Sequence, residues 1–142
     1  MQMGKKPFIG ASDSNNGVTA FVCNTNTSED SNVLGVNYNG SVVENFYHPY
    51  KCLFSDDVKR FVLRNHVGNK YIYLFLKTVI LQQKHKYAYG YKFNEKRMQK
   101  QRILLPVTLN GRPDYEYMEQ YAKRIFNCLK MQYLQRKMTV VI

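Results

Sequence analysis

The chain of 142 residues suits one compact domain, and its hydrophobic content of 44% excludes a wholly disordered protein. The formal net charge of +11 indicates a polyanion as partner, with nucleic acid favoured over an anionic membrane surface. The longest apolar stretch is interrupted by Lys77, and no apolar run follows the basic residues Lys5 and Lys6. We therefore expect a cytoplasmic protein without a transmembrane helix or a secretory signal.

The first half of the chain is predicted to form short strands separated by turns. β-Branched and aromatic residues favour strands over residues 18–23, 32–38, 41–46, 50–54 and 58–63. Asn39-Gly40 is typical of a two-residue hairpin turn between the second and third strands, and His48-Pro49 ends the third. The polar stretches 12–17 and 25–31 are predicted to be turns or loops.

The second half changes to helical periodicity. Residues 70–83 are apolar on most sides, which suits a helix buried against the sheet, and the length of the segment favours this helix over a continuous strand. Residues 103–107 predict a short buried strand, and a second helix is predicted from its N-cap Asp114 to Lys137. We therefore expect an α+β fold. A small mixed or antiparallel β-sheet with a packed helix forms a globule over residues 1–112, and a long C-terminal helix follows over 113–142.

An apolar stripe runs along the predicted C-terminal helix. Its members recur at a spacing of three or four residues: Met118, Tyr121 or Ala122, Ile125, Leu129 and Tyr133. If the helix projects from the globule, the stripe needs another helix to cover it, which predicts a homodimer through this helix. The alternative is that the stripe packs back on the chain's own sheet. The sequence leaves both arrangements open.

Three cysteines lie far apart in the sequence, at Cys23, Cys52 and Cys128. Their odd number and their spacing exclude a complete disulfide framework and do not match a metal site. We expect free thiols that are buried or half-buried, because cysteine usually packs in that way.

Positive charge is concentrated in one segment. Residues 1–69 carry six Lys and Arg against six Asp and Glu, whereas residues 84–102 alone carry seven against one. The cations of such a segment can neutralise DNA phosphates, and its tyrosines can pack on sugars or bases. The planar guanidinium groups of Arg97 and Arg102 can each donate two hydrogen bonds to guanine. The predicted DNA-binding residues of this segment are Lys84, Lys86, Tyr87, Tyr89, Tyr91, Lys92, Lys96, Arg97, Lys100 and Arg102. The alternative is a solvated face that shields a core strand.

The polar run 12–17 is a second candidate for DNA contact. Ser12, Asn15 and Asn16 offer short side chains that can hydrogen-bond to base edges, and Asn pairs naturally with adenine. Such runs also form ordinary turns, and both interpretations stay open.

No catalytic or metal site is predicted. Asp56-Asp57, with His48 upstream, suggests a metal-dependent nuclease, but no second acidic cluster completes such a site. A turn cap, or an ion pair with Arg60 or Arg64, is favoured instead.

Two stretches of the chain resemble the target recognition domain of restriction-modification specificity subunits, of the Type I system and of related bifunctional Type II enzymes. The first comprises Pro7-Phe-Ile-Gly10, Asn15-Asn-Gly-Val-Thr19, Asn39-Gly-Ser-Val42, Phe46-Tyr-His-Pro49 and Ser55-Asp-Asp-Val58. The second comprises Tyr87-Ala-Tyr-Gly-Tyr-Lys92, the run from Asn94 to Pro106, and Pro113-Asp-Tyr-Glu-Tyr-Met118. Their order and spacing extend over nearly the whole chain.

The resemblance implies a bacterial, non-enzymatic specificity module that binds a short asymmetric half-site in the major groove of double-stranded DNA. Its implied partners are a DNA adenine methyltransferase subunit and, in some systems, a restriction subunit; no cofactor is implied. A full specificity subunit holds two such globules apart by paired helices. This chain has one globule and one helix, so it is either an excised or naturally short half-subunit that pairs through the helix, or its second half has been lost.

Two other functions stay open. A small RNA-associated or ribosome-associated basic protein would stack its aromatic residues on unpaired bases. A nuclease subunit would cleave nucleic acid with a divalent metal ion.

Overall fold

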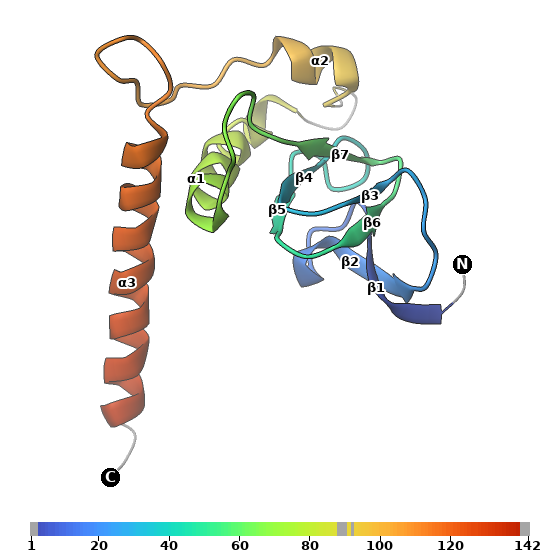
Figure 1. Cartoon of the computed structure of the whole chain (residues 1–142), viewed down its shortest axis with the longest axis horizontal. Coiled ribbons are helices and arrows are strands. Elements are labelled where there is room, and N and C mark those ends of the chain that lie inside the picture. Colours follow the sequence, from blue (N-terminus) through green and yellow to red (C-terminus); the bar gives the residue numbers. More distant parts are fainter. Residues whose placement is uncertain (1–2, 88–90, 92, 140–142) are drawn as a thin grey trace.

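Two small β-sheets, a packed helix and a projecting C-terminal helix make up the fold (Figure 1). The computed structural model describes residues 3–87, 91 and 93–139. None of the helices in these ranges combines the length and the apolar character that a membrane span requires. The arrangement of strands and helices confirms the predicted α+β class.

The first sheet is mixed and has the strand order β2-β1-β6-β3. Strand β1 (Met3–Ile9) pairs antiparallel with β2 (Val18–Val22) and parallel with β6 (Cys52–Phe54), and β3 (Glu29–Asp30) closes the other edge. Between β1 and β2 lies a single 3-10 turn, η1 (Asn15–Gly17).

The second sheet is antiparallel and has the order β5-β4-β7. Its central strand β4 (Val33–Asn37) is buried along its whole length between β5 (Asn45–His48) and β7 (Val58–Phe61). Helix α1 (Lys70–Leu81) packs on this sheet, as predicted, and begins where the Asn69 side chain accepts hydrogen bonds from two backbone N–H groups. The main core consists of buried residues from β4, α1 and the segments around them: Leu34, Val36, Val43, Ile72, Tyr73, Leu76, Ile80, Phe93 and Met118.

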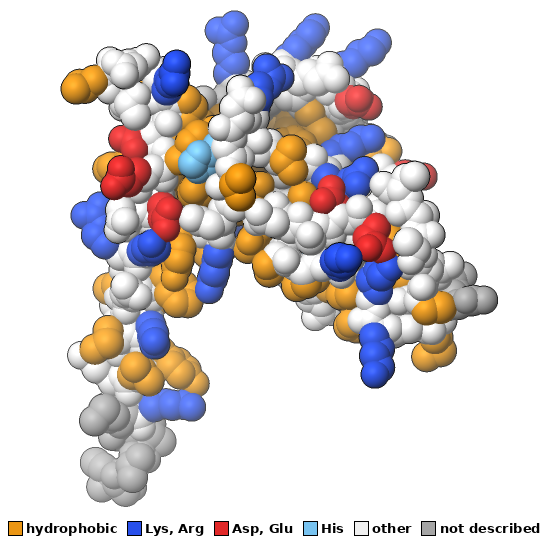
Figure 2. Space-filling view, viewed as in Figure 1, with side chains coloured by type: hydrophobic (Ala, Val, Ile, Leu, Met, Phe, Trp, Pro, Cys, Tyr) orange, Lys and Arg blue, Asp and Glu red, His pale blue; other side chains and the backbone are white. Residues whose placement is uncertain are grey.

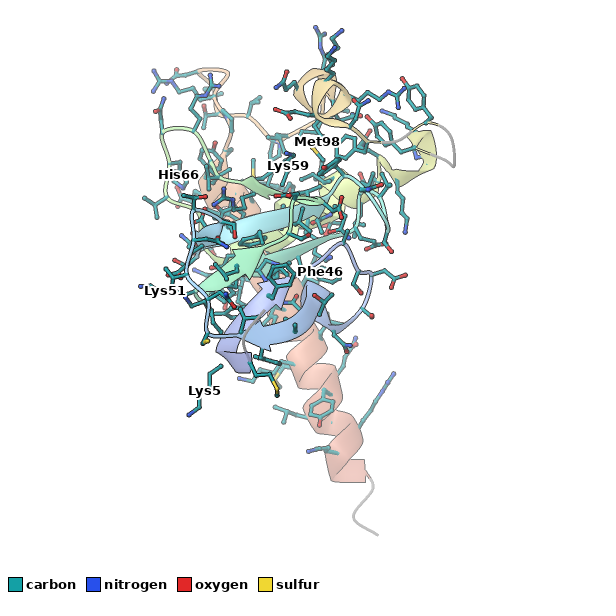
Figure 3. The ribbon with its side chains drawn as sticks, turned by 90° about the vertical axis from the view of Figure 1, so that its right-hand side faces the viewer. Lys5, Phe46, Lys51, Lys59, His66 and Met98 are labelled. Atoms are coloured by element: carbon teal, nitrogen blue, oxygen red, sulfur yellow. The ribbon has the colours of Figure 1, made fainter. Side chains whose placement is uncertain are left out.

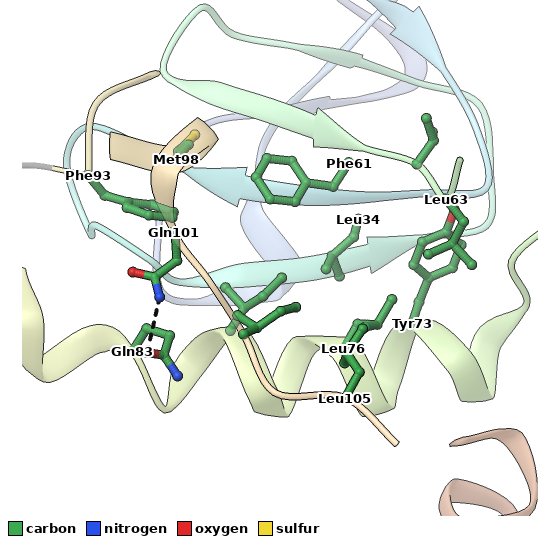
Figure 4. A pocket seen from close by; sticks show the side chains of 13 residues that line it. Leu34, Phe61, Leu63, Tyr73, Leu76, Gln83, Phe93, Met98, Gln101 and Leu105 are labelled. Carbon is green, nitrogen blue, oxygen red and sulfur yellow. Dashed lines mark hydrogen bonds between the residues drawn. The ribbon is translucent and has the colours of Figure 1, made fainter. Parts of the chain in front are cut away.

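A short 3-10 turn, η2 (Lys84–Lys86), and helix α2 (Glu95–Lys100) follow α1. The Asn94 side chain caps α2 by accepting a hydrogen bond from Arg97 N at 3.0 Å. Phe93 and Met98 point from this segment towards the core, where they line a cavity of 190 Å³ between α1 and the second sheet (Figure 4). Hydrophobic anchors therefore attach the basic segment to the globule.

Helix α3 (Tyr115–Thr139) packs on α1 over its N-terminal half. Asp114 accepts a hydrogen bond from Tyr117 N at 2.9 Å, which confirms the predicted N-cap. Met118 is fully buried, and two edge-to-face ring pairs join the helices: Tyr71 of α1 with Phe126 of α3, and Phe75 of α1 with Tyr121 of α3. Ile125, Leu129 and Tyr133 are exposed, so the stripe packs back on the globule only in its first turns.

Several predicted elements differ from the structure. The predicted two-residue hairpin at Asn39-Gly40 is wrong, because residues 38–44 form the loop and β5 begins at Asn45. The physical reason is Val43, which adopts a φ of 70° and turns into the core, so that strand alternation is lost over residues 41–44. His48 lies inside β5, and the strand therefore continues to the residue before Pro49.

The predicted strand over 103–107 is also wrong. Ile103 and Leu105 pack on the main core, but Leu104 is 93% exposed, and the only strand-like pairing of this segment among the described residues joins Val107 to Pro113. Strands β1 and β3 and helix α2 were not predicted. Cys23 and Cys128 are exposed, against expectation, whereas Cys52 is buried as expected.

Candidate nucleic-acid interface

A shallow cleft of 370 Å³ lies beside α2 and gathers most of the predicted contact residues. We call it the basic cleft; its lining residues are Lys86, Tyr87, Tyr91, Arg97, Lys100, Gln101 and Arg102. Four of these seven residues are cations and none is acidic, so the cleft offers a positive surface to an anion.

Hydrogen bonds and ring contacts hold the floor of the basic cleft. The Tyr87 hydroxyl donates to Gln101 Oε1, and Gln101 Nε2 donates to Gln83 Oε1 at 3.2 Å. The Tyr87 ring lies 4.5 Å, between centroids, from the buried Phe93. Burial raises the pKa of Tyr87, so its hydroxyl keeps its proton at neutral pH and remains a donor. The floor of the cleft is therefore a fixed surface.

A stack of three planar groups forms one wall. The Tyr91 ring lies 6.0 Å from the Tyr87 ring at an interplanar angle of 13°, and the Arg97 guanidinium carbon lies 3.6 Å from the Tyr91 ring centroid. A guanidinium over an aromatic face is a cation–π contact that keeps the positive charge. The stack thus combines charge with flat surfaces.

The cations next to the basic cleft differ in their surroundings. Lys84 pairs with Glu44 at 2.5 Å, which neutralises part of its charge. Lys96 is exposed on α2, while Glu95, the one acidic residue of the segment, lies 3.9 Å from Lys59. Figure 2 shows several Lys and Arg side chains projecting at the end of the molecule where α2 lies. In Figure 3 Lys5 lies at the opposite end of the globule.

The structure brings together six residues of the predicted contact set: Lys86, Tyr87, Tyr91, Arg97, Lys100 and Arg102. Lys84 and Lys96 adjoin the cleft in sequence but do not line it. Tyr89 and Lys92 lie outside the described residues. Ser12, Asn15 and Asn16 lie on the loop that precedes β2 and do not line the basic cleft. The predicted set is therefore divided into two sites.

The loop 12–17 presents its two asparagines to solvent. Asn15 and Asn16 have φ angles of 49° and 54°, in the left-handed region, and both are exposed. Asn16 Nδ2 donates to the Tyr50 hydroxyl at 2.8 Å. Asparagine adopts left-handed backbone more readily than most residues, which is why the sequence accommodates this turn.

Within the acidic pair Asp56-Asp57, Asp57 makes hydrogen bonds to the loop after β4. Asp57 accepts a hydrogen bond from Asn39 Nδ2 at 3.0 Å, and its backbone oxygen accepts from Tyr38 N. Arg60 pairs with Asp30 at 3.3 Å, so the predicted ion pair with Asp56-Asp57 is wrong for this arginine. No group of three potential metal ligands occurs among the described residues.

His48, the third member of the suggested nuclease site, is fully buried. Burial lowers its pKa to about 4, which keeps the ring neutral near pH 7.

Three residues of these sites were not predicted: Gln83, Gln101 and Tyr50. The glutamines connect α1 to the chain after α2, and Tyr50 reaches Asn16 from 34 positions away. Contacts between such distant positions leave no periodic signal in one sequence. The start of α2 is visible in the sequence, because Asn94 is a typical N-cap residue and the acidic Glu95 follows it in the first turn.

Comparison with known proteins identifies the family. Residues 2–134 match the family described as Type I restriction modification DNA specificity domain. Over 127 residues the chain is 67% identical to the Type II restriction enzyme BgcI specificity subunit S.BcgI of Heyndrickxia coagulans, an alignment that covers 89% of this chain and 37% of that protein. The chain also aligns with the crystal structure of the Type-I restriction-modification system S subunit from M. genitalium, with 19% identity and a TM-score of 0.46, over 98% of this chain and 35% of that one. Since the family match extends over most of its length, the chain belongs to the Type I restriction modification DNA specificity domain family.

Proposed function

We propose that the chain binds a short asymmetric site in double-stranded DNA and contributes sequence recognition, without catalysis, to a restriction-modification enzyme in the bacterial cytoplasm. The observation that carries the proposal is the basic cleft, where four cations and two stacked tyrosines form one positive surface. The relative from Heyndrickxia coagulans is a specificity subunit of a restriction enzyme, which supports the same role.

The basic cleft is proposed to bind the DNA backbone. Lys86, Lys100 and Arg102 are exposed, so they can neutralise phosphates and release counterions, which gives affinity for any duplex. Stacked Tyr91 and Arg97 present a flat charged surface that suits a sugar–phosphate strand or a base edge.

The loop 12–17 is proposed to contact bases. Ser12, Asn15 and Asn16 lie on a turn held by backbone hydrogen bonds, and Asn side chains can bond adenine through two atoms. A duplex advances about 34 Å per helical turn, which is long enough to contact both the loop and the basic cleft. In this arrangement the cleft supplies affinity and the loop supplies discrimination.

The choice of nucleic acid is tested by fluorescence anisotropy with three labelled probes of equal length: a mixed-sequence duplex, its single strand, and a single-stranded RNA. We expect the duplex to bind most tightly at moderate salt. Stronger binding of the single-stranded RNA would contradict the proposal and favour an RNA-binding protein. Cleavage of the duplex in the presence of Mg²⁺ would contradict the absence of catalysis.

A DNA adenine methyltransferase subunit is the proposed protein partner, with a restriction subunit as a further partner. The relative's name makes it a subunit of a restriction enzyme, and a module that only binds DNA needs a catalytic partner to act on it. This chain spans 37% of that relative, so the partner contacts of the longer protein are assigned here only as a proposal.

Helix α3 is proposed to pair with α3 of a second copy. Beyond its first turns the helix exposes Ile125, Leu129 and Tyr133, and a groove of 550 Å³ lies between α1 and α3. Figure 2 shows hydrophobic side chains along the part of α3 that extends past the globule. An exposed apolar stripe of this length usually marks a contact with another protein surface. A paired helix would make a spacer that carries two globules.

A further inference from the structure

A hydrogen-bond relay joins the exposed loop 12–17 to the interior of the globule. Asn16 Nδ2 donates to the Tyr50 hydroxyl at 2.8 Å, and this hydroxyl lies 3.3 Å from His48 Nδ1. Because the Tyr50 oxygen accepts from Asn16, its own hydrogen is available for His48 Nδ1. The proton of the neutral imidazole then resides on Nε2, which has no hydrogen-bond partner among the described residues. The relay therefore has a defined direction, from Asn16 to Tyr50 to His48.

The His48 end of the relay is fixed by packing. The imidazole is fully buried, and it meets Phe54 edge-on at 5.4 Å and Tyr50 at 5.7 Å between ring centroids. On β4, His48 pairs with Val33, and nearby Gly35 makes space for the imidazole, since a Cβ atom at Gly35 would lie 3.1 Å from His48 Nε2. The ring is thus enclosed by β4, Phe54 and Tyr50.

The loop end of the relay is fixed by its backbone. Gly10 N donates to Gly17 O and Gly17 N donates to Ser14 O, both at 2.9 Å, and Asn37 Nδ2 donates to Ser12 O at 2.9 Å. Gly17 has a φ of 74° and lies against Ile9 and Phe46, so a side chain at this position would be strained. The backbone under Asn16 is therefore set before a ligand binds, which lowers the entropy cost of binding.

We propose that Tyr50, anchored by His48, is a positioning residue that orients the carboxamide of Asn16 for an adenine in the bound duplex; the inference rests on the proposed function. A carboxamide nitrogen carries two hydrogens. One is donated to Tyr50, and the other lies beside Oδ1. Together this hydrogen and Oδ1 form a donor–acceptor pair that matches N7 and the N6 amino group of adenine in the major groove.

The orientation of the carboxamide and the tautomer of His48 are coupled through Tyr50. A flipped Asn16 would turn Oδ1 towards the Tyr50 hydroxyl, which would then donate to Asn16 and accept a hydrogen from His48 Nδ1, so the flip requires the other tautomer of the buried imidazole. The flipped group would also present its donor and acceptor to the base in the opposite order.

The test measures base preference at single positions. Duplexes are first selected by the full chain from a randomised library, and the selected duplex is then compared with duplexes that carry each single base-pair substitution. Four proteins are compared: wild type, Asn16→Gly, Tyr50→Phe and the double variant. Glycine is chosen at position 16 because it keeps the left-handed backbone and removes only the carboxamide.

We expect Asn16→Gly and Tyr50→Phe to weaken the preference at the same A·T pair. The loss should be about five- to 150-fold for Asn16→Gly, the range of a two-bond base contact, and about fivefold for Tyr50→Phe. The double variant should match Asn16→Gly alone, since Tyr50 acts through Asn16. Binding to non-selected duplexes should not change.

Tyr47→Phe is the matched control. It removes a hydroxyl that donates to Asn32 Oδ1 at 2.9 Å, away from the loop, and should keep the full base preference at a similar melting temperature. If Tyr50→Phe keeps the preference, or changes a pair that Asn16→Gly leaves alone, the inference is overturned while the proposed function stands. If the wild-type chain prefers no duplex at all, both are overturned.

Discussion

The guanidinium carbon of Arg97 lies 3.6 Å from the ring centroid of Tyr91, at the edge of the basic cleft. This contact lies on the side of α2 that carries the exposed cations, and it orders a long side chain before DNA is present. Because ordering before binding reduces the entropy lost in the complex, the pair should contribute to DNA affinity as a unit.

Substitution of either member of this pair should weaken DNA binding. Arg97→Lys keeps the positive charge but removes the planar guanidinium, and Tyr91→Ala removes the aromatic ring. Each substitution should therefore reduce the affinity for a duplex by about 0.5–1 kcal/mol. Tyr91→Phe keeps the ring and should bind like wild type. Anisotropy titrations over a double-mutant cycle measure the coupling, and fully additive losses would show that the stack does not act in binding.

The cations of the basic cleft should determine the salt dependence of binding. Replacing Lys86, Lys100 and Arg102 by Ala should lower the log–log slope of affinity against salt by about 2.7, at about 0.9 per phosphate contact. The control removes three exposed cations away from the cleft: Lys5, Lys130 and Lys137. An equal loss of slope in both triple variants would indicate a general charge effect in place of a defined site.

Phe93 should anchor the basic segment. The side chain is 2% exposed and lies 4.5 Å from the Tyr87 ring, so Phe93→Ala removes a buried ring and should lower the free energy of unfolding by about 3–5 kcal/mol. Phe21→Ala is the control. Because Phe21 is 56% exposed, this substitution should lower the free energy of unfolding much less. Chemical denaturation measures both. A similar small loss for the two variants would contradict the anchoring role.

His48 should make stability depend on pH. Its folded pKa of about 4 lies below the unfolded value near 6.5, so between these pH values the unfolded chain binds a proton that the folded chain does not. The free energy of unfolding should therefore fall as the pH drops from 6.5 to 4, by about 3 kcal/mol in total.

Denaturation at a series of pH values tests this, with His48→Gln expected to flatten the curve between pH 4 and 6.5. The chemical shift of the His48 ring in the wild-type protein gives the folded pKa directly. A titration near pH 6.5 in the folded protein would contradict the prediction.

The exposed stripe of α3 should determine the oligomeric state. Ile125→Glu with Leu129→Glu places two charges on the proposed helix–helix contact and should convert a dimer to a monomer in light-scattering measurements. Gln120→Glu with Gln132→Glu adds the same charge to the same helix at polar positions and should leave the dimer in place. A wild-type chain that is monomeric at high concentration would exclude pairing through a second copy.

Local sequence patterns predicted much of this fold. The length and the apolar character of residues 70–83 predicted α1, and Asp114 predicted the start of α3, because both signals lie within a short stretch of the sequence. The loop 38–44 was not predicted, because Val43 is buried by core residues that are distant in the sequence and not by pairing within a strand. The same limit applied to Tyr50, whose role depends on two contacts made in space.

The candidate site was predicted in part for the same reason. A run of cations and tyrosines is visible in the sequence, and six of its members line the basic cleft. The position of the basic cleft relative to the loop 12–17 depends on the order of strands in the first sheet, and this order cannot be predicted from a single sequence. The pairing of Lys84 with Glu44 is likewise a consequence of the folded arrangement.

Selection from a randomised duplex library measures whether the chain recognises a DNA sequence. The immobilised chain is incubated with the library at physiological salt, and the bound fraction is sequenced over several rounds. We expect enrichment of one short asymmetric motif, and loss of that enrichment when the loop 12–17 is substituted. Recovery of duplexes without any shared motif, at undiminished affinity, would show that the chain binds charge alone and does not recognise sequence.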